Sequence, residues 1–418
     1  MRLQQSFSLS CFSLCFVFTA ANSSAAIVID FVNVGDPGNN PLLVEMHDGT
    51  SGYGAVDYAF RIGEFEVTNA QYAAFLNAVA SIDTYKLYNN QMGASVFGGI
   101  IRSGTNGNYS YSLKPNMANK PVNLVTFFDA ARFINWLENG QPSGSQNSST
   151  TEDGTYTFSG EEIVGPRKPG STYFLPNEHE WLKAAFYQPG AVTDDGDEYW
   201  LYATGSDVPV IDALSDSVGN VTNPGPNTIV HGAKANWGGS SGTGNVMTVG
   251  SAGNQTYYGA KDMGGNVFEW QEADLTKYDP LGAGPYMVKG GSFQNYGHVF
   301  NTERGNGTTI GDGDTDGADF LMWQRQYHNF PGPLFADFNR DYKVDELDLA
   351  LWQASYGLNA GGDGDRAGHI HNVANKTVGF RVAAAALPLA VSVPEPSSLV
   401  LASVGILMFV RFRRVTEA

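Results

Sequence analysis

The chain has 418 residues, of which 12% are aromatic and only 16% are charged, so it has far more apolar surface to bury than a disordered chain. Its 42 acidic and 24 basic residues give a net charge of -18, which disfavours nucleic acid and anionic lipid as partners and favours cations. The 50 glycines indicate many turns and loops.

The N-terminus has the pattern of a signal peptide for export. Arg2 precedes an apolar run, and small residues follow up to Ala26, so residues 1–26 are expected to be removed. The alternative is a membrane anchor, for which the apolar run is short. Both cysteines of the chain, Cys11 and Cys15, lie in this segment. The mature chain would therefore have no disulfide, thiolate nucleophile or cysteine metal site.

Three segments have apolar residues at helical spacing. This spacing predicts helices over Asn69–Ala80, Thr126–Leu137 and Asn177–Tyr187. The first follows a capping Thr68, and the third has acidic residues in its first turn, where they complement the helix dipole. Elsewhere between residues 27 and 304 the sequence predicts short strands and long ordered loops.

Between residues 308 and 357 an acidic loop followed by an apolar helical segment occurs twice, which indicates paired calcium-binding units. In the second repeat six positions have the spacing of a loop that wraps oxygen ligands around calcium: Asp337, Asn339, Asp341, the Lys343 carbonyl, Asp345 and Asp348. The first repeat is degenerate, and its acids are Asp312, Asp314, Asp316 and Asp319. The alternative is a pair of solvated acidic turns. The repeats resemble dockerin repeats, which implies a cohesin-like partner.

The C-terminus carries the sequence VPEP, an apolar run and a cluster of arginines over residues 393–414. This order resembles the PEP-CTERM sorting signal. The resemblance implies a processing enzyme that cuts near the Pro-Glu-Pro sequence, transient anchoring in the membrane through this tail alone, and a final location in the outer cell envelope or outside the cell. The alternative is a permanent transmembrane helix, for which the apolar run is short.

Six motifs, in order along the chain, resemble the sulfatase-modifying-factor family of formylglycine-generating-enzyme-like proteins. They are FRIGEFEVTNAQYAAFLNAV from Phe60, PVNLVTFFDAARFINWL from Pro121, FLPNEHEWLKAAF from Phe174, GNVFEW from Gly265, KGGSF from Lys289 and VGFRVA from Val378. The resemblance implies an α+β, loop-rich fold of the C-type-lectin-like kind over residues 27–304 plus 370–384. The small helical dockerin-like module at 308–357 would be inserted before the last strand.

That last strand is expected at VGFRVA, because the alternation of residues from Val378 to Ala383 fits a strand that buries one face. The family resemblance also implies a structural calcium ion. Its ligands would be Asp262, the carbonyls of Gly265 and Val267, and Glu269. The alternative makes the two carboxylates turn caps.

Catalysis is where the sequence departs from the family. The family's enzymes use two cysteines to hold copper, and the matching positions here are Asn295 and Phe300, neither of which gives a thiolate. No catalytic residue is therefore assigned. Ser292, Asn295 and Arg304 are candidates to line a ligand groove, although a lone Ser292 hydroxyl also suits a turn hydrogen bond.

These observations predict an exported, non-catalytic protein that binds a glycan or a protein in this groove and attaches elsewhere through calcium, its one expected cofactor. Two alternatives remain at this point. One is an enzyme of the formylglycine-generating family that uses other oxidoreductase chemistry. The other is a structural protein of a surface matrix.

Overall fold

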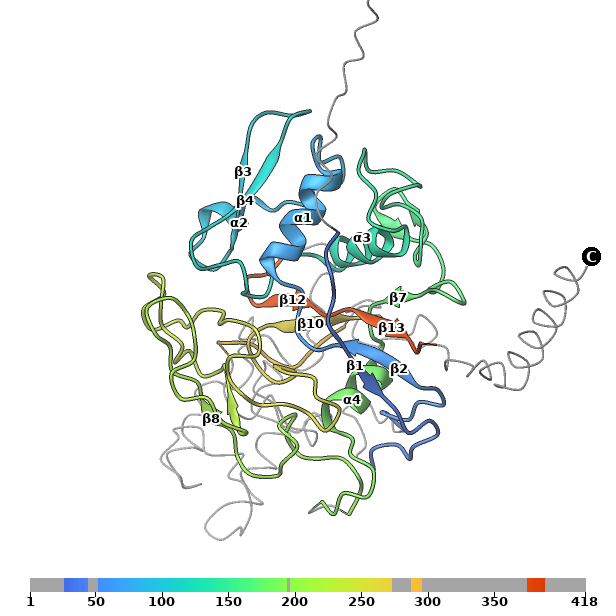
Figure 1. Cartoon of the computed structure of the whole chain (residues 1–418), viewed down its shortest axis with the longest axis vertical. Helices are drawn as coiled ribbons and strands as arrows, with labels where there is room; N and C mark the ends of the chain where they lie inside the picture. Colours follow the sequence, from blue (N-terminus) through green and yellow to red (C-terminus); the bar gives the residue numbers. More distant parts are fainter. Residues whose placement is uncertain (1–25, 44–51, 194–195, 273–286, 295–373, 388–418) are drawn as a thin grey trace, which may run out of the picture. The chain divides into compact units, whose positions relative to one another are not determined.

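A computed structural model describes residues 26–43, 52–193, 196–272, 287–294 and 374–387 (Figure 1). Two compact units divide the chain at Ala385, and nearly all the described residues belong to the first unit. Residues 1–25 of the expected signal peptide, the expected calcium module and the expected sorting tail lie outside the described ranges. Within those ranges, none of the helices has the length and apolar character that crossing a bilayer requires.

The described residues mix helices with short strands, which confirms the expected α+β class. The helices are α1 (Asn69–Val79), α2 (Asn90–Ala94), α3 (Phe127–Glu138) and α4 (Glu178–Phe186). The strands are β1 (Phe31–Val34), β2 (Phe60–Gly63), β3 (Ile100–Ser103), β4 (Ser110–Leu113), β5 (Phe158–Ser159), β6 (Glu162–Ile163), β7 (Tyr173–Phe174), β8 (Ile211–Asp212), β9 (Thr228–Ile229), β10 (Phe268–Gln271), β11 (Met287–Lys289), β12 (Val378–Phe380) and β13 (Ala383–Ala385).

The three predicted helices are confirmed as α1, α3 and α4, with ends within two residues of those expected. Each begins with a capping box. The side chain of the capping residue accepts a hydrogen bond from the backbone N–H three residues later, and the side chain of that later residue accepts one from the backbone N–H of the capping residue. The caps are Thr68, Thr126 and Asn177. Helix α2 was not expected, because its five residues NQMGA bury only Met92 and give no helical periodicity.

Two sheets form the centre of the unit. The larger has the strand order β1-β2-β13-β7 with antiparallel pairs. The smaller has the order β11-β10-β12, in which β10 pairs antiparallel with β11 and parallel with β12. Three further two-stranded ladders, β3-β4, β5-β6 and β8-β9, lie in the loop regions.

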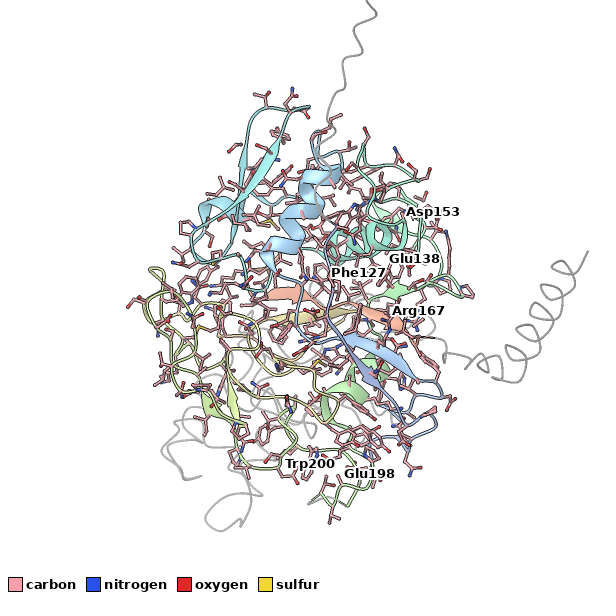
Figure 2. The ribbon with its side chains drawn as sticks, viewed as in Figure 1. Phe127, Glu138, Asp153, Arg167, Glu198 and Trp200 are labelled. Atoms are coloured by element: carbon pink, nitrogen blue, oxygen red, sulfur yellow. The ribbon has the colours of Figure 1, made fainter. Side chains whose placement is uncertain are left out.

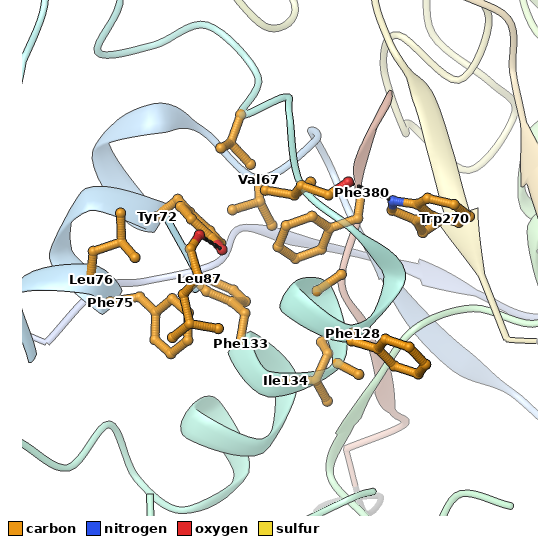
Figure 3. Close-up of a cluster of buried hydrophobic side chains, with 14 of the residues drawn as sticks. Val67, Tyr72, Phe75, Leu76, Leu87, Phe128, Phe133, Ile134, Trp270 and Phe380 are labelled. Carbon is orange, nitrogen blue, oxygen red and sulfur yellow. Dashed lines mark hydrogen bonds between the residues drawn. The ribbon is translucent and has the colours of Figure 1, made fainter. Parts of the chain in front are cut away.

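The largest hydrophobic core lies between the two long helices and the smaller sheet (Figures 1 and 3). Phe133 of α3 stacks on Tyr72 of α1 at 6.0 Å between ring centroids, and it meets Phe380 of β12 edge-on at 5.3 Å. Trp270 of β10 is fully buried in the same core, and its indole N–H donates to the Val125 carbonyl at 3.1 Å. The apolar faces of α1 and α3 are thus the covering layer of β10 and β12.

Two further hydrophobic cores lie elsewhere in the unit. Trp181 and Phe186 of α4 form one core cluster with Phe60 and Ile62 of β2. The loop-rich region contributes its own cluster around Trp237, together with Met247, Val267 and Phe293. All the residues of β10 and β12 are buried, so both faces of these two strands are covered.

The expectation of one strand with one buried face at VGFRVA is wrong. The segment forms two short strands, β12 and β13, that join different sheets and are separated by Arg381 and Val382. Val378 to Ala384 are all buried, because the segment passes between the two sheets and has packing on each side. This pairing places the segment in the same unit as β2 and β10.

Candidate functional site

Three motifs that are distant in the sequence meet in the smaller sheet. GNVFEW supplies β10, KGGSF begins with the last residue of β11, and VGFRVA begins as β12. In the register of the sheet, Glu269 lies opposite Lys289 on one side and Gly379 on the other. A side chain at Gly379 would come within 2.4 Å of the Val122 carbonyl, so the close approach of this strand requires glycine.

The turn before β10 is held by backbone contacts. Gly265 has a φ of 91°, and an added Cβ would lie 2.6 Å from the Val230 carbonyl oxygen. Its N–H donates to the Gly290 carbonyl at 2.6 Å, and the Phe293 N–H donates to the Asn266 carbonyl at 2.9 Å. These contacts fix the GGS turn against the start of β10.

Arg381 and Glu269, which lies in β10 after this turn, form a fully buried ion pair. The guanidinium Nη2 lies 2.7 Å from Oε1 of Glu269, and the exposed fractions of the two side chains are 0% and 1%. Arg381 also donates to the carbonyls of Gly63 and Lys261, at 2.8 and 2.7 Å. The Trp181 indole N–H donates to Oε2 of Glu269 at 2.8 Å. Both side chains therefore have hydrogen-bond partners besides each other, which offsets the free-energy cost of burying the two charges.

Two more carboxylates, Glu66 and Asp262, lie close to this pair. Burial raises the pKa of Glu66 well above its usual range, and the negative charge of Asp262 raises it further. Burial also raises the pKa of Asp262 to about 6, against the lowering effect of a hydrogen bond from the backbone N–H of Gly250. Three carboxylates thus face one guanidinium, and the shortage of positive charge favours protonation of Glu66 and Asp262.

The implied calcium ligands Asp262, Gly265, Val267 and Glu269 come together in this region, but their contacts do not fit a calcium cage. Both oxygens of Glu269 already accept hydrogen bonds, from Arg381 and from Trp181. A calcium ion there would have to displace the guanidinium. Among the described residues, no group of three or more His, Cys, Asp or Glu side chains is arranged to hold a metal ion.

Only part of the predicted ligand groove lies in the described ranges. Ser292 is fully buried, and its hydroxyl accepts from the Gln294 N–H at 3.3 Å, so it braces the turn instead of lining a groove. The next residue, Phe293, is also buried and stacks on Phe97 at 5.7 Å between ring centroids. Asn295, Phe300 and Arg304 lie outside the described residues, as do all the predicted ligands of the 308–357 module.

A second cluster of charged groups was not predicted from the sequence. Arg167, labelled in Figure 2, lies in the loop between β6 and β7. Its guanidinium lies 2.8 Å from Glu180 and 3.5 Å from Glu272. The hydroxyl of Tyr58 donates to Glu180 at 2.6 Å, and that of Tyr156 donates to Glu272 at 2.5 Å. Burial raises the pKa of Glu272 to about 7, although Arg167 acts to lower it. Arg167 belongs to no sequence motif, so no pattern in the sequence indicated this cluster.

A family model described as the sulfatase-modifying factor enzyme 1-like domain matches residues 53–315. This range covers more than half of the chain. The chain belongs to this family. The match extends into the beginning of the expected calcium module, and it stops before β12 and β13.

Several solved structures resemble this family member. The crystal structure of CarF is 18% identical over 86% of this chain and 99% of its own, with a TM-score of 0.39. Treponema denticola variable protein 1 is 15% identical over 85% and 95%, with a TM-score of 0.37. PvdO from Pseudomonas aeruginosa is 15% identical over 86% and 92%, with a TM-score of 0.32. No curated protein matches the chain.

Proposed function

We propose that this protein is an exported, non-catalytic member of the sulfatase-modifying-factor family that binds a glycan or protein ligand. The observation that carries the proposal is the identity of two positions. Asn295 and Phe300 stand where the family resemblance places the copper-binding cysteines, and the chain has no cysteine beyond Cys11 and Cys15. Without thiolates the chain cannot hold copper in the family's way.

The framework beneath that site supports a binding role. The GGS turn is tied to the start of β10, and the Arg381–Glu269 pair stands behind it. Such a framework can hold a ligand surface in place without catalytic groups. Because Ser292 is buried, Asn295 and Arg304 are the proposed ligand contacts.

The remaining segments would determine where the protein is located and to what it is attached. We propose that residues 308–357 are a dockerin-like insertion in a C-type-lectin-like domain and attach the protein to a cohesin-like partner through calcium. The PEP-CTERM-like tail would deliver the protein to the outer envelope or the exterior. Calcium is assigned to the loop from Asp337 to Asp348 and not to Glu269, whose oxygens hold Arg381.

A glycan array probed with the mature chain tests the binding role. We expect selective, saturable signals that weaken in Asn295→Ala and Arg304→Ala but not in Asn108→Ala, an exposed control in the turn between β3 and β4. Selective signals that persist in both groove variants would place the binding elsewhere. Blank arrays, together with no protein captured from the native cell envelope, would favour the structural role in a surface matrix.

Membership of the family keeps one enzymatic alternative in view, an oxidoreductase that uses other chemistry. Incubating the mature protein with a cysteine-containing sulfatase peptide, copper and oxygen addresses it. We expect no aldehyde product above a control without protein. Product that depends on the protein would overturn the non-catalytic assignment.

Export and processing are tested on protein recovered from the native host. Mass spectrometry should find a chain that begins near Ile27 and ends between Pro394 and Pro396. Peptides that run from Pro396 into Arg414 would show that the tail is retained as a permanent anchor.

A further inference from the structure

The segment before β1 passes the two long helices and is held there by glutamine side chains (Figure 1). Ile27 and Ile29 pack against the largest core, whereas Val28 between them is 73% exposed. This alternation is that of a strand with one buried face, yet residues 26–30 form no strand. The backbone polar groups of the segment therefore need partners outside a sheet.

Gln141 supplies two of these partners at once. Its side-chain Oε1 accepts from the Ile27 backbone N–H at 2.8 Å, and its Nε2 donates to the Ile27 carbonyl at 2.9 Å. The Gln71 amide of α1 donates to the next carbonyl, that of Val28, at 2.9 Å. The backbone of Ile27 is thus bound by a residue that lies 114 positions later in the chain.

The backbone of Gln141 is unusual for a residue with a Cβ. Its φ is 61°, in the left-handed region, and it follows Gly140, whose φ is 80°. Glycine or asparagine suits such a position better. Other residues hold this conformation where contacts of their own offset the strain. The two hydrogen bonds to Ile27 are such contacts.

The end of α3 adds a negative potential at this place. Gln141 lies shortly after Glu138, the last residue of the helix, and its backbone N–H donates to the Trp136 carbonyl at 2.8 Å. The C-terminus of a helix carries a partial negative charge, which a basic side chain in the last turn can balance. The last turn of α3 has no basic residue. A cation beside Gln141 would therefore be stabilised.

We propose that Gln141 and the C-terminal end of α3 form a binding site for the α-ammonium group of Ile27, which exists only after the signal peptide has been removed. The inference rests on the proposed cleavage after Ala26, which makes this nitrogen the N-terminus of the mature chain. Capture of an N-terminal amine by polar groups of the backbone and side chains is a known mode of recognition.

Cleavage changes the chemistry of this nitrogen and not its place. As an amide it donates one uncharged hydrogen bond to Gln141. As an ammonium it donates a charge-assisted hydrogen bond and interacts with the dipole of α3. Its other two hydrogens can reach water, since Ile27 is only half-buried. Removal of the signal peptide would thus fasten the N-terminal segment onto the helices.

The test compares two chains released from a fusion by a protease, one that begins at Ile27 and one that begins at Ser24. Only the first places the charge beside Gln141. At about pH 6, where an α-amino group is protonated, we expect it to melt about 2 °C higher. Gln141→Leu should abolish this difference, and Gln141→Glu should increase it because a carboxylate then faces the ammonium. Gln91→Leu, at an exposed glutamine in α2, should leave it unchanged.

A second measurement follows the amine itself. Acetic anhydride labels free amines, and mass spectrometry of the N-terminal peptide gives the rate at Ile27. We expect this rate to be about fivefold lower than in Gln141→Leu, because a bound ammonium loses its proton less readily. The rate in Gln91→Leu should equal that of the wild type.

The inference is overturned if the two chains melt alike, if Gln91→Leu removes the difference as Gln141→Leu does, or if Gln141→Leu leaves the labelling rate unchanged. If Gln141→Leu does not fold, Gln141→Glu and the comparison of the two starts decide. The mass of the native protein shows separately where export cuts. A native start at Ile27 with equal melts counts against this site alone, whereas a native start elsewhere with unequal melts counts against the cleavage position and the use of the site.

Discussion

Arg381 connects segments that lie far apart in the chain. Its guanidinium contacts Glu269 of β10, the carbonyl of Gly63 at the end of β2, and the carbonyl of Lys261 in the loop before β10. It is fully buried, so none of these interactions is weakened by solvent. One residue therefore joins the two central sheets electrostatically.

Arg381→Met should lower the free energy of unfolding by about 3–5 kcal/mol, because Glu269 would be left as a buried charge without its partner. Urea denaturation measures this loss. The control is Lys168→Ala, which breaks an exposed pair with Asp153 and should cost less than about 1 kcal/mol. A small loss for Arg381→Met that grows when a chelator is added would show that calcium takes over at Glu269, contrary to the contacts described here.

Glu272 should make stability depend on pH. Its pKa is raised to about 7, so the folded chain holds this proton more tightly than the unfolded chain does. The resulting stabilisation is complete at low pH, below about 4.3 where unfolded glutamates titrate, and it is lost as the pH rises through the folded value.

We expect Glu272→Gln to flatten the pH dependence of the unfolding free energy across this interval by up to about 1.4 kcal/mol per pH unit. Denaturant titrations at a series of pH values measure this slope. Glu161→Gln, at an exposed position between β5 and β6, should leave the slope as in the wild type. Equal slopes in wild type and Glu272→Gln would mean that Glu272 is ionised throughout the interval.

At the scale of elements, β12 and β13 connect the two central sheets, because each strand belongs to a different sheet. β12 is an edge strand of the smaller sheet, whereas β13 lies between β2 and β7 in the larger one. Val378 and Phe380 of β12, and Val382 between the two strands, belong to the largest core. A chain that ended before them would lack a central strand of one sheet and an edge of the other.

Deleting residues 311–357 and joining the ends with a short Gly/Ser linker should leave a folded domain, because loop length adds closure entropy only logarithmically. Truncation at Gly305 should instead cost several kcal/mol, since it removes Phe380, Arg381 and Val382 from the core. Thermal melts of the two variants make the comparison. A truncated chain that melts as cooperatively and as high as the linked one would show that β12 and β13 are dispensable.

At the scale of the whole molecule, calcium should act through the 308–357 module. Asp337→Ala or Asp348→Ala removes a charged ligand and should abolish most of the rise in Tm that calcium produces, because metal binding adds to folding stability. Thermal melts with calcium and with chelator measure the rise. Asp262→Asn should leave the rise intact if calcium does not bind beside Glu269. Identical wild-type melts with and without calcium would contradict the module assignment.

The sequence by itself determined the helices, because their signals act over a few residues. The spacing of Tyr72, Phe75 and Leu76 and the caps at Thr68 and Thr126 lie within one or two helical turns of the residues they order. The family motifs and the lack of cysteine outside the N-terminal segment were also read directly from the residues.

Only the tertiary structure shows which groups the predicted site residues contact, because those partners are distant in the chain. The family resemblance implies that Glu269 is a calcium ligand, yet Arg381, 112 residues later, donates hydrogen bonds to its oxygens. Period-two alternation could not reveal that the VGFRVA segment divides between two strands, β12 and β13, in different sheets, since alternation reports only the segment's own residues. The cluster of Arg167, Glu180 and Glu272 is likewise set by long-range packing, which no local pattern encodes.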